Sequence, residues 1–337
     1  MTGPALADSP PLLVVANAGS GRHDSAELAQ ALTARLGVPG AGRRHELLLA
    51  QRGADLPALA VEALRRAQAR RGVVVAAGGD GSINAVAQAL LGADVALGVL
   101  PRGTFNYFAR SQGVPIDLAE GIELLAQARP TLRRVQVGRV NGRVFLVNAS
   151  LGLYPRLLED REVWKQRLGR SRAVAALAAL VTLWREHRPY ALGLDRAAPD
   201  GAADAALRLR ASTLIVGNNP LQLARLGLPE AQAVVDGELA AFALPPLGPL
   251  ALGRLLLAGA LGRLADSEQL TRFAFGQLTV HAGQRRARHG VKLALDGELL
   301  RLATPLTFDL APTPLHLVVP AGLEDCRDAA LDSEAAA

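Results

Sequence analysis

The chain has 337 residues, half of them hydrophobic, so it is long for one domain and can bury a substantial core. Its single cysteine, Cys326, excludes a disulfide framework within the chain, and its histidines lack the spacing of a zinc site. The net charge of +6 favours anionic partners such as nucleotides or an acidic membrane face, although arginines on solvated faces explain it equally well.

The first 130 residues alternate between predicted strands and predicted helices. This alternation predicts a Rossmann-like parallel α/β domain over residues 1–130, with helices on both faces of the sheet. Ligands of such domains bind at the carboxyl ends of the strands. The predicted strands are residues 12–16, 45–50, 73–77 and 95–100, and the predicted helices are residues 25–36, 56–70, 82–91 and 118–126.

After residue 130 the pattern changes to short β-type runs, several of them separated by Asn-Gly or Asp-Gly turns. We expect an antiparallel β-sandwich domain over residues 131–323, whose last run, residues 315–319, could return to the first domain. Residues 324–337 are acidic and alanine-rich and are expected to form a disordered tail. The other runs are residues 133–140, 143–148, 191–194, 207–216, 239–244, 277–282, 291–295 and 306–310, and helical insertions are expected near 170–186 and 248–264.

Three predicted strands of the first half end in glycine-rich polar loops. In a parallel sheet these loops lie on the same edge, and glycines there let backbone N–H groups approach a phosphate. A single glycine after a strand is more often only a tight turn, so the argument depends on all three loops. The first loop contains Asn17, Ser20 and Gly21, the second Gly78, Gly79, Asp80, Gly81, Ser82 and Asn84, and the third Gly103, Thr104 and Asn106.

Two common phosphate motifs are absent from the chain. Neither G-x-x-x-x-G-K-[ST] nor a G-x-G-x-x-G that opens a helix after a strand is present. A P-loop NTPase and an ordinary dinucleotide dehydrogenase are therefore disfavoured.

The three loops resemble those of the diacylglycerol kinase catalytic domain, most closely its bacterial lipid kinase branch, which is related to sphingosine and ceramide kinases. Later motifs agree in order: Val216-Gly217-Asn218-Asn219, Asp236-Gly237 and Leu295-Asp296-Gly297-Glu298. The resemblance covers about residues 10–320. It implies that ATP and Mg²⁺ bind in a cleft between the α/β and β-sandwich domains. It also implies transfer of the γ-phosphate to a hydroxyl of a diacylglycerol-like lipid.

Three carboxylates are candidates for this chemistry: the resemblance implies the roles of Asp296 and Asp236, and the preference of Mg²⁺ for oxygen ligands indicates that of Asp80. Asp296, with Glu298 beside it, would be the base or orienting group for the substrate hydroxyl, although Asp-Gly there also fits a plain hairpin turn. Asp80 would hold Mg²⁺ through water, and its alternative role is to cap the helix that begins near Ser82. Asp236 resembles the aspartate of a structural cation site.

The nucleotide ligands are expected in the three loops of the first half. Backbone N–H groups near Gly79 and Gly81 would hold phosphates. Asn17 and Asn106 would fix the loops or touch the nucleotide. The hydroxyls of Ser20, Ser82 and Thr104 would add donors.

Some residues depart from the family's pattern. Tyr107 stands where many relatives have an aspartate, Arg102 replaces a commonly apolar residue, and Asn219 stands where glycine is frequent. These changes leave open a nucleotide- or lipid-binding regulatory module without turnover. A soluble kinase of the NAD kinase type is a further alternative.

Membrane contact and location are separate expectations. Residues 161–188 place arginines and a lysine around an apolar run, which suits a helix at an anionic membrane surface or a buried helix with charged ends. With one cysteine and no visible secretory signal, we expect a cytoplasmic protein that contacts the inner face of the membrane. Sparse aromatic residues argue against nucleic-acid binding, and the sequence leaves a homodimer open.

Overall fold

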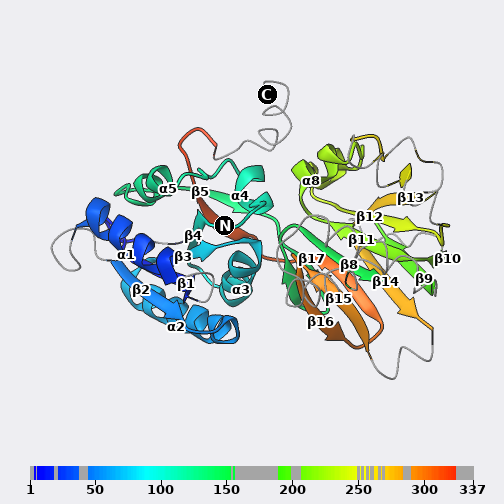
Figure 1. Ribbon diagram of the computed structural model, residues 1–337, viewed down its shortest axis with the longest axis horizontal. Coiled ribbons are helices and arrows are strands. Elements are labelled where there is room, and N and C mark those ends of the chain that lie inside the picture. Colours follow the sequence, from blue (N-terminus) through cyan, green and yellow to red (C-terminus); the bar gives the residue numbers. More distant parts are fainter. Residues whose placement is uncertain are drawn as a thin grey trace. The chain divides into compact units, whose positions relative to one another are not determined.

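The computed structural model describes residues 4, 6–18, 22–37, 45–152, 155, 189–198, 206–248, 251, 254–255, 258, 262–264, 267, 270–283 and 290–323. The chain divides into two compact units (Figure 1). The first unit comprises residues 1–137 and 311–337, and the second comprises residues 138–310. The boundary that the sequence predicts after residue 130 lies just before β5 (Thr131–Val135), a strand of the first unit's sheet.

The first unit is built on a six-stranded sheet with the order β2-β1-β3-β4-β18-β5. All pairs in this sheet are parallel except β18 with β5, which confirms the predicted parallel α/β fold. Its central strands are buried on both faces, as their continuous apolar sequences require. The remaining bounds are β1 (Leu12–Asn17), β2 (His45–Ala50), β3 (Val73–Gly78), β4 (Ala96–Pro101) and β18 (Leu315–Val319).

Helices cover both faces of this sheet. Helices α2 (Leu56–Arg70) and α3 (Asp80–Leu90) contact each other on one face, while α1 (Arg22–Leu36) and α5 (Leu118–Leu125) contact each other on the opposite face (Figure 1). Leu28 and Leu32 of α1 pack with alternate residues of the strands, as the two-residue period of a strand dictates. A short helix, α4 (Tyr107–Ser111), follows the third loop and was not predicted.

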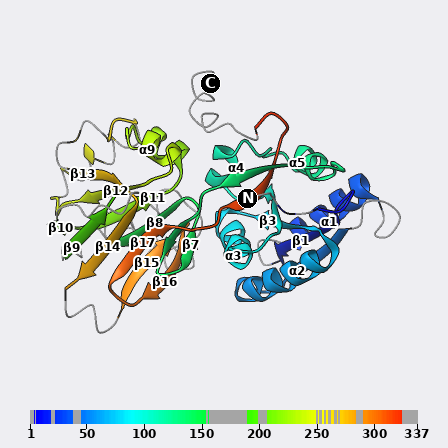
Figure 2. The same ribbon diagram turned by 180° about the vertical axis from the view of Figure 1, so that it is seen from behind.

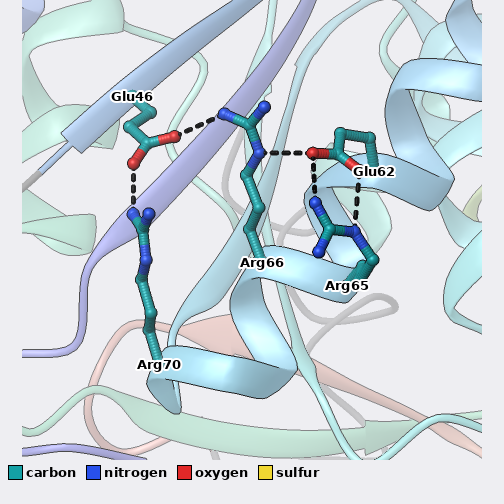
Figure 3. A network of polar contacts seen from close by, with 5 residues as sticks. All are labelled: Glu46, Glu62, Arg65, Arg66 and Arg70. Carbon is teal, nitrogen blue, oxygen red and sulfur yellow. Dashed lines mark hydrogen bonds and ion pairs between the residues drawn. The ribbon is translucent and has the colours of Figure 1, made fainter.

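An ion-pair network ties α2 to the edge strand β2 (Figure 3). Glu46 of β2 accepts hydrogen bonds from Arg70 and, at 2.8 Å, from Arg66. Glu62 accepts from Arg66 at 2.7 Å and from both Nε and Nη2 of Arg65. Hydrogen bonds from Arg65 and then Arg66 lower the pKa of Glu62 to about 2, and those from Arg70 and Arg66 lower the pKa of Glu46. Because these side chains are partly exposed, the network fixes geometry more than it stabilises the fold.

The second unit consists of two six-stranded sheets whose pairs are antiparallel. One sheet has the order β10-β9-β14-β17-β6-β7, and the other has the order β13-β12-β11-β8-β15-β16. We call the second the motif-bearing sheet, because the motifs around Asn218, Asp236 and Asp296 adjoin its strands. The bounds of the first sheet are β6 (Gly138–Val140), β7 (Arg143–Phe145), β9 (Tyr190–Ala197), β10 (Leu207–Ala211), β14 (Gln277–Ala282) and β17 (Leu306–Leu310). Those of the motif-bearing sheet are β8 (Asn148–Gly152), β11 (Thr213–Gly217), β12 (Leu239–Leu244), β13 (Thr271–Phe275), β15 (Val291–Leu295) and β16 (Glu298–Leu302).

One hydrophobic core joins the two sheets, so the predicted β-sandwich is confirmed. Phe308 and Leu194 of one sheet belong to the same core as Val216 and Leu293 of the other. The outer face of the motif-bearing sheet is covered by α8 (Pro220–Arg225) and α9 (Ala231–Val235), which pack with residues of β12 (Figure 2).

Three predicted strands are wrong as continuous strands, because in each the chain leaves one sheet for another. The run 143–148 splits into β7 and β8, which lie in different sheets of the second unit, and the run 207–216 splits likewise into β10 and β11. The run 133–140 splits into β5 of the first unit and β6 of the second. Extended, apolar residues occur on both sides of each break, so a sequence pattern alone shows one strand.

The segment expected at a membrane surface, residues 161–188, lies outside the described residues, as do the predicted helical insertion 170–186 and the tail 324–337. Of the insertion 248–264, only scattered positions are described. Within the described part of the chain, no helix has the length and apolar character needed to cross a bilayer.

Candidate active site

The second and third predicted loops meet at one edge of the first unit's sheet, and the first loop begins beside them. Strands β1, β3 and β4 are parallel neighbours, so the loops that follow them lie at the same edge. Gly78, which ends β3, pairs with Pro101, which ends β4. Asn17 ends β1, whereas Ser20 and Gly21 lie outside the described residues.

The second and third loops touch through glycine backbone. A Cβ atom added to Gly103 would lie 2.7 Å from the Cα of Gly79, and one added to Gly79 would lie 3.2 Å from the Cα of Gly103. A Cβ on Gly78 would meet the Ser82 side chain at 2.6 Å. Close packing of the two loops therefore requires glycine at positions 79 and 103, and packing within the second loop requires it at position 78, in addition to any approach by a phosphate.

Asn106 holds the third loop closed. Its Oδ1 accepts from the Gly103 N–H at 2.8 Å, and its Nδ2 donates to the Gly103 carbonyl at 2.9 Å. The residue is buried and has a left-handed backbone with φ 51°, a conformation that asparagine tolerates better than most residues. The Asn106 side chain thus fixes the backbone of the loop.

Asp80 links the second loop to the helix after the third loop. Its carboxylate oxygens accept from the N–H groups of Tyr107 at 3.2 Å and Phe108 at 3.1 Å, the first turn of α4. Burial raises the pKa of Asp80, against the opposing effect of these N–H donors. Asp80 therefore caps α4, a helix remote in sequence, as well as opening its own helix α3.

The first turn of α3 offers donors to an anion. Counting along the chain, helical hydrogen bonding of this turn begins with the Ile83 N–H, which donates to the Gly79 carbonyl at 3.0 Å. Because the first N–H groups of a helix have no intrahelical acceptor, those of Gly81 and Ser82 can bond to a phosphate. Asn84 lies half-buried on the same helix.

The outer part of the third loop is exposed and aromatic. Thr104 is exposed, and Phe105 is 58% exposed and stacks on Tyr107 with ring centroids 5.6 Å apart. Arg110 donates from Nε to the Phe105 carbonyl at 3.1 Å, which steadies the tip of the loop. Arg102 Nη2 lies 3.7 Å from Oε2 of Glu27 in α1.

In the second unit, the three later motifs meet at one end of the motif-bearing sheet. The pairing of Asn148 with Gly217 and of Gly217 with Ala240 aligns the start of β8, the end of β11 and the start of β12. Leu295 pairs with Ala149, which brings the end of β15 to the same place. The motifs around Asn218, Asp236 and Asp296 therefore follow or precede neighbouring strands at that end.

Asp296 is both a hairpin-turn residue and an anchor for β8. Asp296 and Gly297 have φ values of 47° and 92°, as a tight turn between β15 and β16 requires. The Asp296 carboxylate accepts three backbone N–H bonds, from Leu146 at 2.7 Å, Val147 at 2.8 Å and Asn148 at 2.9 Å. These bonds lie at the point where the chain passes from β7 to β8. Glu298, the first residue of β16, is exposed.

Asp236 is an exposed residue at the end of α9 that accepts from Gln232 Nε2 at 3.2 Å. In the part of the chain that the structure describes, no group of three or more His, Cys, Asp or Glu side chains could hold a metal ion by itself. A hard cation at Asp80 or Asp236 would take its further ligands from other oxygen atoms, such as those of carbonyl groups, water or a bound phosphate.

Two residues near Asp296 were not found from the sequence. Asn148 is buried at the start of β8, and its Nδ2 donates to Gln222 Oε1 of α8 at 2.9 Å. The polar pair Asn148 and Ser150 within an apolar strand was a signal that could have been used. Gln222 gave no signal, because a glutamine in a short helix is ordinary.

Comparison with known proteins places these loops in a recognisable family. A family model described as the diacylglycerol kinase catalytic domain matches residues 11–140. A protein of Pseudomonas aeruginosa named "Probable lipid kinase YegS-like" is 30% identical over 288 residues, which cover 84% of this chain and 87% of the relative. A Klebsiella pneumoniae protein of the same name is 44% identical over 81 residues, 23% of this chain and 27% of the relative. A crystal structure of a diacylglycerol kinase from Bacillus anthracis has a TM-score of 0.62 at 17% identity and covers 93% of this chain and 98% of its own, which shows a shared fold.

Proposed function

Because this chain belongs to the diacylglycerol kinase catalytic-domain family and is a lipid kinase, we propose that it transfers the γ-phosphate of ATP to a hydroxyl of a diacylglycerol-like lipid. The observation that carries the proposal is the backbone contact between Gly79 and Gly103, which joins two phosphate-type loops at the carboxyl edge of a parallel sheet. The Bacillus anthracis enzyme of the same fold is named a diacylglycerol kinase, which suggests the acceptor class.

The first unit would hold the nucleotide. The N–H groups of Gly81 and Ser82 at the start of α3 suit a phosphate, and the Ser82 and Thr104 hydroxyls add donors. Asn17 ends the neighbouring strand β1 and is proposed to contact the same ligand. Phosphoryl transfer depends mainly on positioning and on neutralising charge, and the fixed loops provide the positioning.

Mg²⁺ would fit this arrangement as a shared ion. Mg²⁺ is usually bound by one or two carboxylates together with phosphates and waters, so the single Asp80 carboxylate beside a bound phosphate is sufficient. When bound, the ion would neutralise charge on the phosphates. Asp236 remains a proposed ligand of a separate structural cation, and its carboxylate also accepts a hydrogen bond from Gln232.

The second unit would supply the group that orients the acceptor. Three backbone N–H bonds fix the Asp296 carboxylate, and a fixed carboxylate can orient a hydroxyl and accept its proton. The hydroxyl oxygen would form a bond to the γ-phosphorus, the bond from that phosphorus to the β–γ bridging oxygen would break, and ADP would leave. The exposed Glu298 is proposed to assist beside it.

The structure bears on the alternative of a module that binds without turnover. That alternative relied on Tyr107 in place of the usual aspartate and on Asn219 in place of the frequent glycine. At this position the Asp80 bond uses the backbone N–H of Tyr107, which any residue except proline supplies. The replacement at position 107 therefore leaves this contact with Asp80 intact, which favours the kinase over the binding module at this position.

An ATP-consumption assay with a panel of lipids tests the proposal. The panel comprises diacylglycerol, monoacylglycerol, sphingosine, ceramide and phosphatidylglycerol. We expect turnover with at least one lipid, abolished by Asp80→Ala and sharply reduced by Asp296→Ala. ATP binding without phosphorylation of any lipid would support the binding module instead, and full activity of Asp296→Ala would remove Asp296 from its proposed role.

We also propose contact with an anionic membrane surface, because a lipid acceptor has to be reached in a bilayer and the chain carries a net charge of +6. Residues 161–188 would contribute the basic and apolar side chains. Co-sedimentation with vesicles of phosphatidylcholine, with and without phosphatidylglycerol, measures this contact. Equal and negligible binding to both would contradict it.

A further inference from the structure

The tip of the third loop exposes a stacked pair of aromatic rings. Phe105 is 58% exposed, and its ring stacks on that of Tyr107 with the centroids 5.6 Å apart and the planes at 13° to each other. An exposed phenylalanine forgoes much of the free energy that removal of its ring from water would provide. Together with the exposed Arg110, these two residues form a surface feature that we call the aromatic tip.

Hydrogen bonds hold the aromatic tip in this exposed position. Arg110 donates from Nε to the Phe105 carbonyl at 3.1 Å and from its backbone N–H to the Asn106 carbonyl at 3.0 Å. The backbone N–H of Tyr107 donates to the Asp80 carboxylate at 3.2 Å. Because both ends of this short segment are fixed in this way, the fold itself presents the Phe105 ring to the surroundings of the protein.

The aromatic tip lies in a basic stretch of the chain. Residues 101–112 include two arginines and neither aspartate nor glutamate. The Arg102 side chain is mostly buried and lies near Glu27, whereas Arg110 is exposed beside the rings. The Asp80 carboxylate is turned toward the backbone N–H groups of α4. Apolar rings beside an exposed cation are complementary to the interface of an anionic bilayer, which accepts apolar groups and attracts positive charge.

Exposed apolar side chains occur directly beside the proposed site residues of each unit. Among the described residues, the exposed large apolar side chains are Val61, Phe105, Leu207 and Leu299. Phe105 is the neighbour of Thr104, a proposed nucleotide contact, and Leu299 is the neighbour of Glu298, which is proposed to assist Asp296. An enzyme that takes its acceptor from a bilayer has to bring such residues close to the lipid, so apolar side chains are expected there.

We propose that the aromatic tip enters the interface of an anionic bilayer and brings the first unit to the membrane that holds its substrate. Phe105 would lie among the upper acyl carbons, Tyr107 at the level of the head groups, and Arg110 against lipid phosphates. The inference rests on the proposed lipid kinase function. It adds a membrane contact at the third loop, separate from residues 161–188.

An aromatic ring near a nucleotide site has a second use, which is to stack on the adenine ring. The exposed Arg110 favours the bilayer, because a neutral adenine needs no cation whereas an anionic bilayer attracts one. The two roles also differ in kinetics. Stacking on adenine makes Phe105 affect the KM for ATP with every acceptor, whereas entry into a bilayer makes it affect only acceptors that a bilayer presents.

The first test is co-sedimentation of the full chain with vesicles of phosphatidylcholine and phosphatidylglycerol. Phe105→Ser removes the exposed ring, and the matched control Val61→Ser removes an apolar side chain that is equally exposed, at 58%, on α2. We expect the partition coefficient to fall about 10-fold in Phe105→Ser, the effect of burying much of one phenylalanine side chain, and to stay unchanged in Val61→Ser. Equal partitioning of the two variants, or negligible binding of the wild-type chain, overturns the inference.

A second measurement locates the tip in the bilayer. Phe105→Cys or Val61→Cys in a Cys326→Ser background gives the chain a single thiol, which is labelled with a fluorophore that reports the polarity around it. We expect the emission at position 105 to shift to the blue when anionic vesicles are added and the emission at position 61 to stay constant. A constant emission at position 105 overturns the inference.

Kinetics separate this inference from the proposed function. With a short-chain diacylglycerol below its critical micelle concentration, Phe105→Ser should turn over like the wild-type chain, and with diacylglycerol in vesicles its lipid KM should rise. A raised KM for ATP with both acceptors, at unchanged vesicle binding, overturns the inference in favour of adenine stacking and leaves the kinase function in place. Turnover of no lipid by the wild-type chain contradicts the kinase function, and the partition coefficients then still decide the bilayer contact.

Discussion

Replacing Gly103 by alanine should separate the two phosphate-type loops. The new Cβ would lie 2.7 Å from the Cα of Gly79 and 2.8 Å from Asn106 Oδ1. Carbon atoms in good contact are about 3.5–4.0 Å apart, so the Gly79 contact alone is short by roughly 1 Å. Backbone cannot swing aside as a flexible side chain can, and the same displacement would strain the two bonds between Asn106 and Gly103. Overpacking of this kind costs about 1–3 kcal/mol.

The expected result is a loss of both stability and catalysis. At about 2–4 °C for each kcal/mol, the melting temperature should fall by roughly 2–12 °C. A catalytic group misplaced by about 1 Å can cost about 100-fold, so kcat/KM for ATP should fall by that order. Differential scanning fluorimetry and the ATP-consumption assay measure the two effects. The control is Gly283→Ala, where a Cβ meets nothing within 4 Å. If Gly103→Ala behaves like Gly283→Ala in both assays, the close contact of the loops is refuted.

Three further variants test the carboxylates. Asp296→Asn turns an NH₂ group toward backbone donors, so we expect a loss of about 1–3 kcal/mol in chemical denaturation and a large loss of turnover; unchanged stability would refute the triple backbone contact. Burial raises the pKa of Asp80 above its ordinary value of 3.8, so its stabilising contribution is present below pH 3.8 and is lost as the pH rises through the raised pKa. Asp80→Asn should remove this trend from denaturation curves recorded from pH 3.8 upward. The pKa of Glu62 is lowered to about 2 from 4.5, so its contribution to stability is present above pH 4.5 and is lost as the pH falls toward 2. The difference in melting temperature between wild type and Glu62→Gln should therefore vanish near pH 2. A difference that stays constant with pH would count against the network in Figure 3.

Much of the fold could be predicted because its signals are local. Apolar runs followed by glycine-rich polar loops predicted β1, β3 and β4, and their alternation with helical patterns predicted the parallel sheet. The short helix α4 was missed because its first turn is capped by Asp80, which lies 27 residues before Tyr107. The division of residues 143–148 between two sheets was missed for a similar reason, since the bonds at the break come from Asp296, 150 residues after Leu146.

Those parts of the candidate site that depend on one residue type, such as glycine in the loops, could be predicted from the sequence. Glycine at positions 79 and 103 could be recognised as necessary, but the partner of each glycine could not, because the contact joins separate loops. The same limit applies to Asn148 and Gln222, which lie far apart in the sequence and are ordinary residues when considered singly. Local chemistry therefore predicted the loops, while tertiary contacts determined how they are held.

The central claim is that this chain phosphorylates a lipid hydroxyl with ATP. The direct measurement is transfer of radiolabelled γ-phosphate from ATP to each lipid of the panel, diacylglycerol first, in the presence of Mg²⁺, followed by separation of the lipid products. We predict labelled phospholipid with the wild-type chain and a loss of label with Asp296→Ala at unchanged ATP binding. ATP binding by the wild-type chain without label in any lipid of the panel would contradict the claim.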